Sequence, residues 1–227
     1  MRIAAQVLSG CLIAGLSPAL LANGGGSMPS TSMSMPRVQS PQEKARDAYN
    51  DGVRAVKKGD KAAENAAHAT DASQKDKANK EAHDAYAAAL AKFQEAVQQD
   101  ARLAEAWNYY GYSSRKLGNY DDALAAYGKA LALKPGYPDA LEYRGEAYLG
   151  LNRLDEAKQS YLDLYAGNRQ LAGKLLGAMK GWSATQRGAS GASAENLDEF
   201  DKWIHEREQI AAQTAALTRA GTAASWR

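Results

Sequence analysis

The residue types that most often carry catalysis or hold metal ions are few and scattered in this sequence. His205-Glu206 begins like the zinc motif of metalloproteases, but Gln209 stands where that motif needs its second histidine. His68 and His83 lie in a polar stretch without ordered cysteine or carboxylate partners. A glycine triplet at 24–26 lacks the lysine and hydroxyl residue of a phosphate-binding loop. We therefore predict no metal site, no cofactor and no enzymatic activity.

The composition of the chain excludes further classes of function. The chain has 227 residues, which suits one or two domains, and 45% hydrophobic with 24% charged residues is ordinary for a globular protein. Its 28 lysines and arginines nearly balance 26 acidic residues, which argues against a dedicated nucleic-acid-binding protein. A single cysteine excludes an intramolecular disulfide. Recognition of another protein is the chemistry that remains.

The N-terminus has the layout of a secretory signal peptide over residues 1–22. Arg2 precedes an apolar run from Ile3 to Leu16, and Pro18 then breaks the run before small residues that end at Ala22. The run is short for a membrane-spanning helix, although a retained anchor is the alternative. Residues 23–40 are rich in glycine, serine, methionine and proline, which predicts a flexible linker.

Cys11 offers a second interpretation of the same segment. Leu8-Ser9-Gly10-Cys11 resembles the box of bacterial lipoproteins, where a leucine and two small residues precede the cysteine that receives lipid. The apolar run continues beyond Cys11, whereas a lipid-modified cysteine normally ends it. We favour cleavage near Ala22, with lipidation at Cys11 as the alternative.

The middle of the chain repeats with a period of 34 residues. A shift of 34 brings Ala106-Trp107-Asn108-Tyr109-Tyr110-Gly111 onto Ala140-Leu141-Glu142-Tyr143-Arg144-Gly145, and Tyr127 onto Tyr161. The pattern resembles the tetratricopeptide repeat, a pair of antiparallel helices. The signature positions in the best unit hold Trp107, Gly111, Gly118, Tyr120, Ala123, Tyr127, Ala130 and Pro135.

The resemblance implies an all-α fold, a right-handed helical solenoid of about three helix pairs. Its units would span about 45–103, 104–137 and 138–171, within a repeat domain of 41–171. Small residues let the two helices of a pair approach closely, and Pro135 ends the second helix of its unit. Each pair leaves an apolar face that its neighbour must cover.

The first unit carries an insertion. Gly52 lies 59 residues before Gly111, and Gly59 lies 59 before Gly118, so about 25 extra residues fall near 61–85. This segment forms helix well but is poor in large apolar residues, so we expect it to have nothing to bury. We expect a lengthened helical hairpin with a break near 70–73. It is either a solvated extension or an arm that binds a partner.

The C-terminal part, 172–219, reads as a helical cap followed by a tail at 220–227. Apolar residues at helical spacing run from Leu171 to Trp182, and a linker follows at 183–192. A second apolar stripe holds Leu197, Phe200, Trp203, Ile204 and Ile210. This stripe could cap the stack, occupy its groove or bind another chain, and we favour the cap.

The resemblance also implies a concave groove lined by the first helix of each unit. The corresponding positions of this chain are Arg46, Tyr49, Asn50, Val53, Glu105, Asn108, Tyr109, Tyr112, Arg115, Asp139, Glu142, Tyr143 and Glu146. We expect a cationic side near Arg46 and Arg115 and an acidic side near Asp139, Glu142 and Glu146. Some relatives bind a C-terminal carboxylate through a Lys/Asn/Lys/Arg set, which Tyr49, Tyr109 and Glu142 break here.

These features together predict an exported, non-catalytic adaptor in the periplasm of a Gram-negative type of bacterium. Its partner would be a protein or peptide segment of the cell envelope, bound as a helix or an extended strand. Membrane attachment would depend on lipidation at Cys11. The alternatives are a lipid-anchored assembly factor of the outer membrane or pili, and a structural protein that self-associates through its C-terminal stripe.

Overall fold

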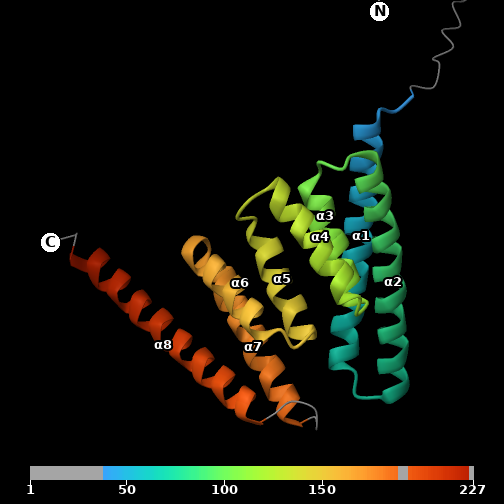
Figure 1. Ribbon diagram of the computed structural model, residues 1–227. Coiled ribbons are helices and arrows are strands. Elements are labelled where there is room, and N and C mark those ends of the chain that lie inside the picture. Colours follow the sequence, from blue (N-terminus) through green and yellow to red (C-terminus); the bar gives the residue numbers. More distant parts are fainter. Residues whose placement is uncertain (1–37, 189–193, 225–227) are drawn as a thin grey trace, which may run out of the picture. The chain divides into compact units, whose positions relative to one another are not determined.

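The computed structural model describes residues 38–188 and 194–224. The signal peptide, Cys11, most of the 23–40 linker and the end of the tail lie outside these residues. Within them the chain is helical and has no strand, which confirms the all-α prediction (Figure 1). The helices are α1 (Pro41–His68), α2 (Ala72–Gln99), α3 (Ala104–Lys116), α4 (Tyr120–Leu133), α5 (Pro138–Gly150), α6 (Leu154–Gly167), α7 (Arg169–Gly188) and α8 (Ala194–Ala224).

The helices form antiparallel pairs that stack in chain order. Helix α1 packs along α2, α3 along α4, and α5 along α6. Successive pairs meet where α2 contacts α3, α4 contacts α5 and α6 contacts α7. The first helices also touch one another, α1 to α3, α3 to α5 and α5 to α7. This arrangement is a helical solenoid, as the repeat spacing predicts.

A glycine on the first helix makes each close approach possible. An added Cβ at Gly52 would lie 2.6 Å from the Phe93 ring, and one at Gly111 would lie 2.6 Å from the Tyr127 ring. At Gly145 the same atom would meet Leu175 of α7 at 2.6 Å. Real Cβ atoms do not come so close, so a side chain at any of these positions would force its packed neighbour to shift.

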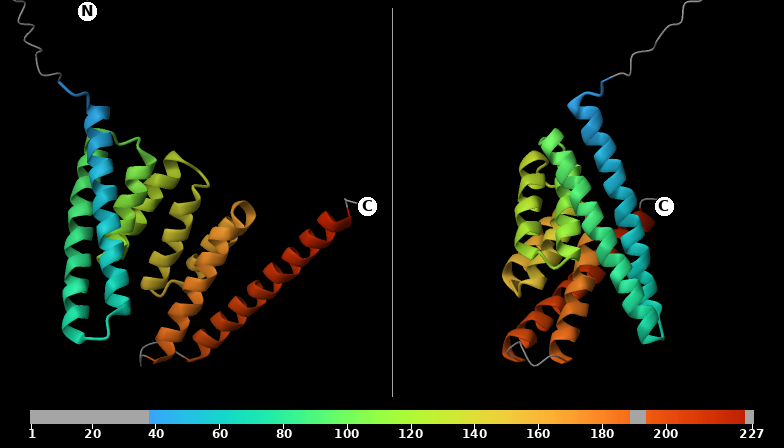
Figure 2. Two further views of the ribbon diagram at one scale, coloured as in Figure 1. Left: turned by 180° about the vertical axis from the view of Figure 1, so that it is seen from behind. Right: turned by 90° about the vertical axis from the view of Figure 1, so that its right-hand side faces the viewer.

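The insertion lengthens both helices of the first pair rather than adding a separate element. Ser40 and Glu43 form a capping box that starts α1, and Asp71 caps α2 by accepting a hydrogen bond from the Gln74 N–H. The chain turns at 69–71 between the two helices (Figure 2).

The extended part of this hairpin buries more than its composition suggests. The buried residues there are all alanines, and they are Ala62, Ala66, Ala78, Ala82 and Ala85. Alanine stripes on both helices let the backbones approach, so burial proceeds without large apolar side chains. The expectation that this segment has nothing to bury is therefore corrected.

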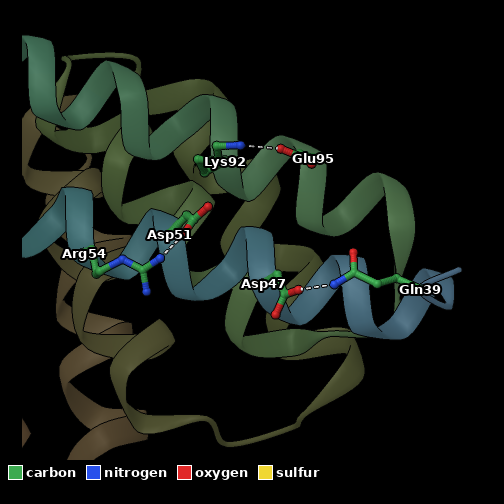
Figure 3. Close-up of polar contacts among 6 residues, drawn as sticks. All are labelled: Gln39, Asp47, Asp51, Arg54, Lys92 and Glu95. Carbon is green, nitrogen blue, oxygen red and sulfur yellow. Dashed lines mark hydrogen bonds and ion pairs between the residues drawn. The ribbon is translucent and has the colours of Figure 1, made fainter. Parts of the chain in front are cut away.

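The outer sides of α1 and α2 are covered by local polar contacts (Figure 3). Gln39 donates a hydrogen bond of 2.8 Å to Asp47, and Lys92 donates one of 2.8 Å to Glu95. Arg54 pairs with Asp51 three residues earlier. Exposed pairs of this kind contribute about 0–1 kcal/mol each to the free energy of unfolding. They keep the outer surface of the hairpin polar but add little to its stability.

The C-terminal helices α7 and α8 pack against α5 and α6 and bury a second cluster of apolar side chains there. Met179 of α7 and Phe200 of α8 are fully buried, and the Trp203 ring lies 5.4 Å from that of Tyr161. Helix α7 begins at Arg169, inside the predicted last unit, and α8 runs beyond the predicted end of the cap at 219. Of the predicted stripe, Leu197, Phe200 and Ile204 are buried, whereas Ile210 is 39% exposed.

None of the helices in the described ranges is both long and apolar enough to span a membrane.

Gly111→Ala and Gly128→Ala test the close approach of α3 and α4. The first places a Cβ against Tyr127, so we expect it to lower the free energy of unfolding by about 1–3 kcal/mol. A Cβ at Gly128 of α4 meets nothing within 4 Å, so that variant should gain up to about 1 kcal/mol through helix propensity. Urea unfolding followed by circular dichroism measures both, and equal stabilities would contradict this packing.

Candidate binding face

A continuous row of tyrosine rings crosses the first helices of three successive pairs. The Tyr49 ring of α1 lies 5.9 Å from Tyr109 of α3, and Tyr109 lies 6.2 Å from Tyr112, both edge-on. Tyr112 lies 4.9 Å from Tyr143 of α5. We call the surface that carries Tyr49, Tyr109, Tyr112 and Tyr143 the tyrosine face. Three of these tyrosines are half-buried, and Tyr112 is buried.

The tyrosine face rests on aromatic side chains of the second helices. Phe93 of α2 stacks under Tyr109 with ring centroids 5.3 Å apart, and Tyr127 of α4 lies 6.4 Å from Tyr143. Both supporting rings are fully buried. Because each ring is held by several others, the exposed edges of the tyrosines have little freedom to move.

Asp60 ties three helices together beneath one end of this face. The hydroxyl of Tyr86 on α2 donates a hydrogen bond of 2.7 Å to Asp60 Oδ1, and the hydroxyl of Tyr112 donates one of 2.6 Å to the same oxygen. Bonds to an ionised carboxylate are stronger than neutral ones. Asp60 was not among the binding residues predicted from the sequence. The one sequence signal for it is its position directly after Gly59, at the predicted turn of the first unit.

The charged residues of the face are paired with one another. Arg115 Nη1 lies 2.5 Å from Glu146 Oε2, and its guanidinium sits over the rings of Tyr112 and Tyr143 at 5.3 and 5.6 Å. Lys174 of α7 lies 2.9 Å from Oε1 of Glu142, whose side chain is fully buried. Burial raises the pKa of Glu142, against the lowering effect of Lys174. The expected split into a cationic and an acidic side is therefore wrong where Arg115, Glu142 and Glu146 meet.

The predicted groove residues fall into three groups by exposure. Arg46 and Asn50 are exposed, and Asn108, Tyr112 and Glu142 are buried. The half-buried ones are Tyr49, Val53, Glu105, Tyr109, Arg115, Asp139, Tyr143 and Glu146. Asn108 is only 1% exposed and Glu142 is 0% exposed, so both lie beneath the surface rather than on it.

Burial moves the pKa of the tyrosine hydroxyls further above neutral pH, where they are protonated in any case. It raises the pKa of Tyr49 to about 12, with smaller contributions from Tyr109, Glu105 and Asp139. Burial also raises the pKa of Tyr112, and the hydrogen bond to Asp60 raises it further. The face therefore presents neutral rings and hydroxyl donors.

The histidines take part in surface contacts along their own helices. His68 Nδ1 lies 2.9 Å from the carbonyl oxygen of Glu64, and His205 Nε2 lies 2.9 Å from the side-chain nitrogen of Gln209. Among residues 38–188 and 194–224, no three His, Cys, Asp or Glu side chains are grouped as a metal ion would need.

Asp60→Ala tests the tie between α1, α2 and α3. Loss of the acceptor leaves two tyrosine hydroxyls without their carboxylate, so we expect the free energy of unfolding to fall by about 2 kcal/mol. The matched control is Asp51→Ala on the same helix, which loses only an exposed pair with Arg54 and should change stability by less than about 0.5 kcal/mol. Equal effects of the two substitutions would mean that the hydrogen bonds to Asp60 add no more to stability than an exposed ion pair does.

Comparison with known proteins supports the repeat assignment. The sequence model of the tetratricopeptide repeat matches residues 67–138 and 111–172, which covers most of the stacked pairs. No curated protein sequence matches the chain.

Three solved structures are similar to the chain in part. The second tetratricopeptide domain of human RPAP3, in complex with an HSP70 peptide, is 21% identical, with a TM-score of 0.46, and the match covers 61% of this chain and 98% of that one. The yeast Sti1 TPR2B domain in complex with pHsp70 is 14% identical, with a TM-score of 0.38, and the match covers 72% of this chain and 98% of that one. MamA is 20% identical, with a TM-score of 0.42 and coverages of 78% and 99%. By the match of its repeats, the chain is a tetratricopeptide repeat protein.

Proposed function

We propose that this protein is a non-catalytic adaptor that binds a segment of another protein across the tyrosine face. The observation that carries the proposal is the row of half-exposed rings of Tyr49, Tyr109 and Tyr143 on three neighbouring helices. Tyrosine offers a large contact area with few rotatable bonds and a polar tip, and it is frequent among residues that dominate binding energy.

The packing beneath the face favours tight binding. Phe93 and Tyr127 support the half-exposed rings of Tyr109 and Tyr143, so a partner would find these rings already in place. Asp60 in turn fixes the buried Tyr112, which packs against Tyr143. Binding to a preorganised surface avoids much of the entropy cost of ordering side chains. A partner laid across α1, α3 and α5 would meet aromatic edges and hydroxyl donors in sequence, which suits a helix or an extended segment.

The proposal includes export to the bacterial periplasm and a partner in the cell envelope. Its support is the signal-peptide layout of residues 1–22. The intact mass of the protein from cell fractions tests this part. We expect a periplasmic species that begins near Asn23, whereas a lipid on Cys11 would favour the membrane-anchored alternative. A chain that keeps Met1 and stays in the cytoplasm would contradict export.

Crosslinked capture from an envelope extract tests the tyrosine face itself. Tyr109→Ala removes a central ring of the face, so we expect it to reduce capture of the partner at least about tenfold. Tyr110→Ala is the matched control, because Tyr110 is also half-buried on α3 but packs beside Trp107, with ring centroids 5.9 Å apart.

Circular dichroism confirms that both variants are folded before capture is compared. Equal capture by the two variants would remove the tyrosine face from the proposal. Capture of nothing but a second copy of the chain would instead favour the self-associating alternative, for which Ile210 and Leu217 of α8 are exposed.

A further inference from the structure

The hydroxyl groups of the tyrosine face divide into a satisfied one and three free ones. The hydroxyl of Tyr112 donates its hydrogen bond to Asp60. The hydroxyls of Tyr49, Tyr109 and Tyr143 form no hydrogen bond with any residue of the described ranges. All three of these oxygens reach solvent, because none is among the side-chain oxygens that the fold buries without a partner. The free donors therefore lie on the half-exposed rings of three neighbouring helices.

The charged groups beside the Tyr143 end of this row are already paired within the chain. Arg115 pairs with Glu146 and rests on the ring of Tyr143. The buried Glu142 pairs with Lys174 of α7. Because these charges cancel in pairs, they do not require a charged partner. What the row offers instead is the surface of its rings and the hydrogens of its free hydroxyls.

A hydroxyl donor needs an acceptor, and the conformation of a bound segment decides whether its backbone supplies one. In an α-helix the carbonyl groups are used inside the helix, apart from those of the last turn. A segment in the polyproline II conformation has no internal hydrogen bonds, so each of its carbonyl groups is free. The free hydroxyls of the row therefore favour an extended partner over a helical one.

The apolar rings of the row favour proline within such a segment. Neighbouring rings between Tyr49 and Tyr143 lie 4.9–6.2 Å apart. A turn of polyproline II advances about 9 Å, so about two turns cover the row. Proline adds a rigid apolar ring and has no N–H, so it brings no backbone donor against the hydroxyls. Segments of this kind dock on surfaces lined by aromatic rings.

We propose that the partner segment is rich in proline and binds across Tyr49, Tyr109 and Tyr143 in the polyproline II conformation. Its pyrrolidine rings would lie against the tyrosine rings, and its carbonyl oxygens would accept hydrogen bonds from the three hydroxyls. Phe93 and Tyr127 hold the tyrosine rings, and proline fixes the segment, so binding loses little conformational entropy. This inference rests on the proposed function and names the chemical class of the partner.

The test compares three uncharged, end-blocked peptides of equal length on the full chain. One is polyproline, one alternates glycine with serine, and one is an alanine–glutamine peptide whose helix content is checked by circular dichroism. Binding of the fluorescein-labelled peptides is followed by anisotropy. We expect polyproline to bind at least about fivefold more tightly than either of the others, because it alone is preorganised with free carbonyl groups.

Two phenylalanine variants locate the hydrogen bonds. Tyr109→Phe keeps the ring but removes a free hydroxyl, so it should weaken polyproline binding about two- to tenfold, the range expected for one hydrogen bond. Tyr110→Phe is the matched control and should leave binding unchanged. Tyr110 is also half-buried on α3, but it lies outside the row and packs beside Trp107. Circular dichroism checks that both variants keep their helices.

The outcomes separate this inference from the proposed function. Binding of either other peptide as tight as that of polyproline would overturn the inference, and so would equal losses in Tyr109→Phe and Tyr110→Phe. If capture of the cellular partner still depends on Tyr109 in that case, the tyrosine face keeps its role and only the class of segment is wrong. Capture that does not depend on Tyr109 would contradict the proposed function whatever the peptides show.

Discussion

The contact between a glycine on a first helix and a large side chain packed against it is the constraint on which the structure depends. Phe93 packs against Gly52, Tyr127 against Gly111 and Leu175 against Gly145, each so closely that a Cβ on the glycine would force its neighbour to shift. In the first two pairs the glycine leaves room for a buried aromatic ring of the second helix to pack against the backbone of the first helix. That ring then supports the tyrosines on the other side, so the packing of the core determines the surface above it.

Several polar groups are buried within this apolar packing, and their loss of hydration has to be offset by hydrogen bonds or ion pairs. A tyrosine hydroxyl loses its water when it is buried, and the loss is offset only when an acceptor is present. Asp60 accepts from both Tyr86 and Tyr112 and so satisfies two hydroxyls from two helices. Arg115 is held in a similar way by Glu146 and by two ring faces. The same contacts that satisfy these groups fix the orientation of the rings.

The 34-residue spacing was sufficient to predict the pairs α3–α4 and α5–α6, because small and large residues recur at the same positions of each pair. It was not sufficient for side-chain partners. The bonds from Tyr86 and Tyr112 to Asp60 span 26 and 52 residues, and repeat positions give a face of a helix but not what lies opposite. The alanine contacts of the extended hairpin were missed because apolar periodicity is judged from large side chains. Glu142 was placed on the surface by its repeat position, whereas its side chain is fully buried and pairs with Lys174, which is 58% exposed.

The central claim is that the tyrosines of α1, α3 and α5 form one packed and protonated surface. An absorbance titration of tyrosine ionisation tests it most directly, together with circular dichroism at each pH. The folded-state pKa values of Tyr49, Tyr112 and Tyr143 are raised, so their stabilising contribution is complete below about pH 10 and is lost as the pH rises through the folded values. The account predicts that a large share of the 12 tyrosines ionises only together with alkaline unfolding, at about pH 12. Ionisation of all of them near pH 10, in a chain that keeps its helices, would contradict the packed face.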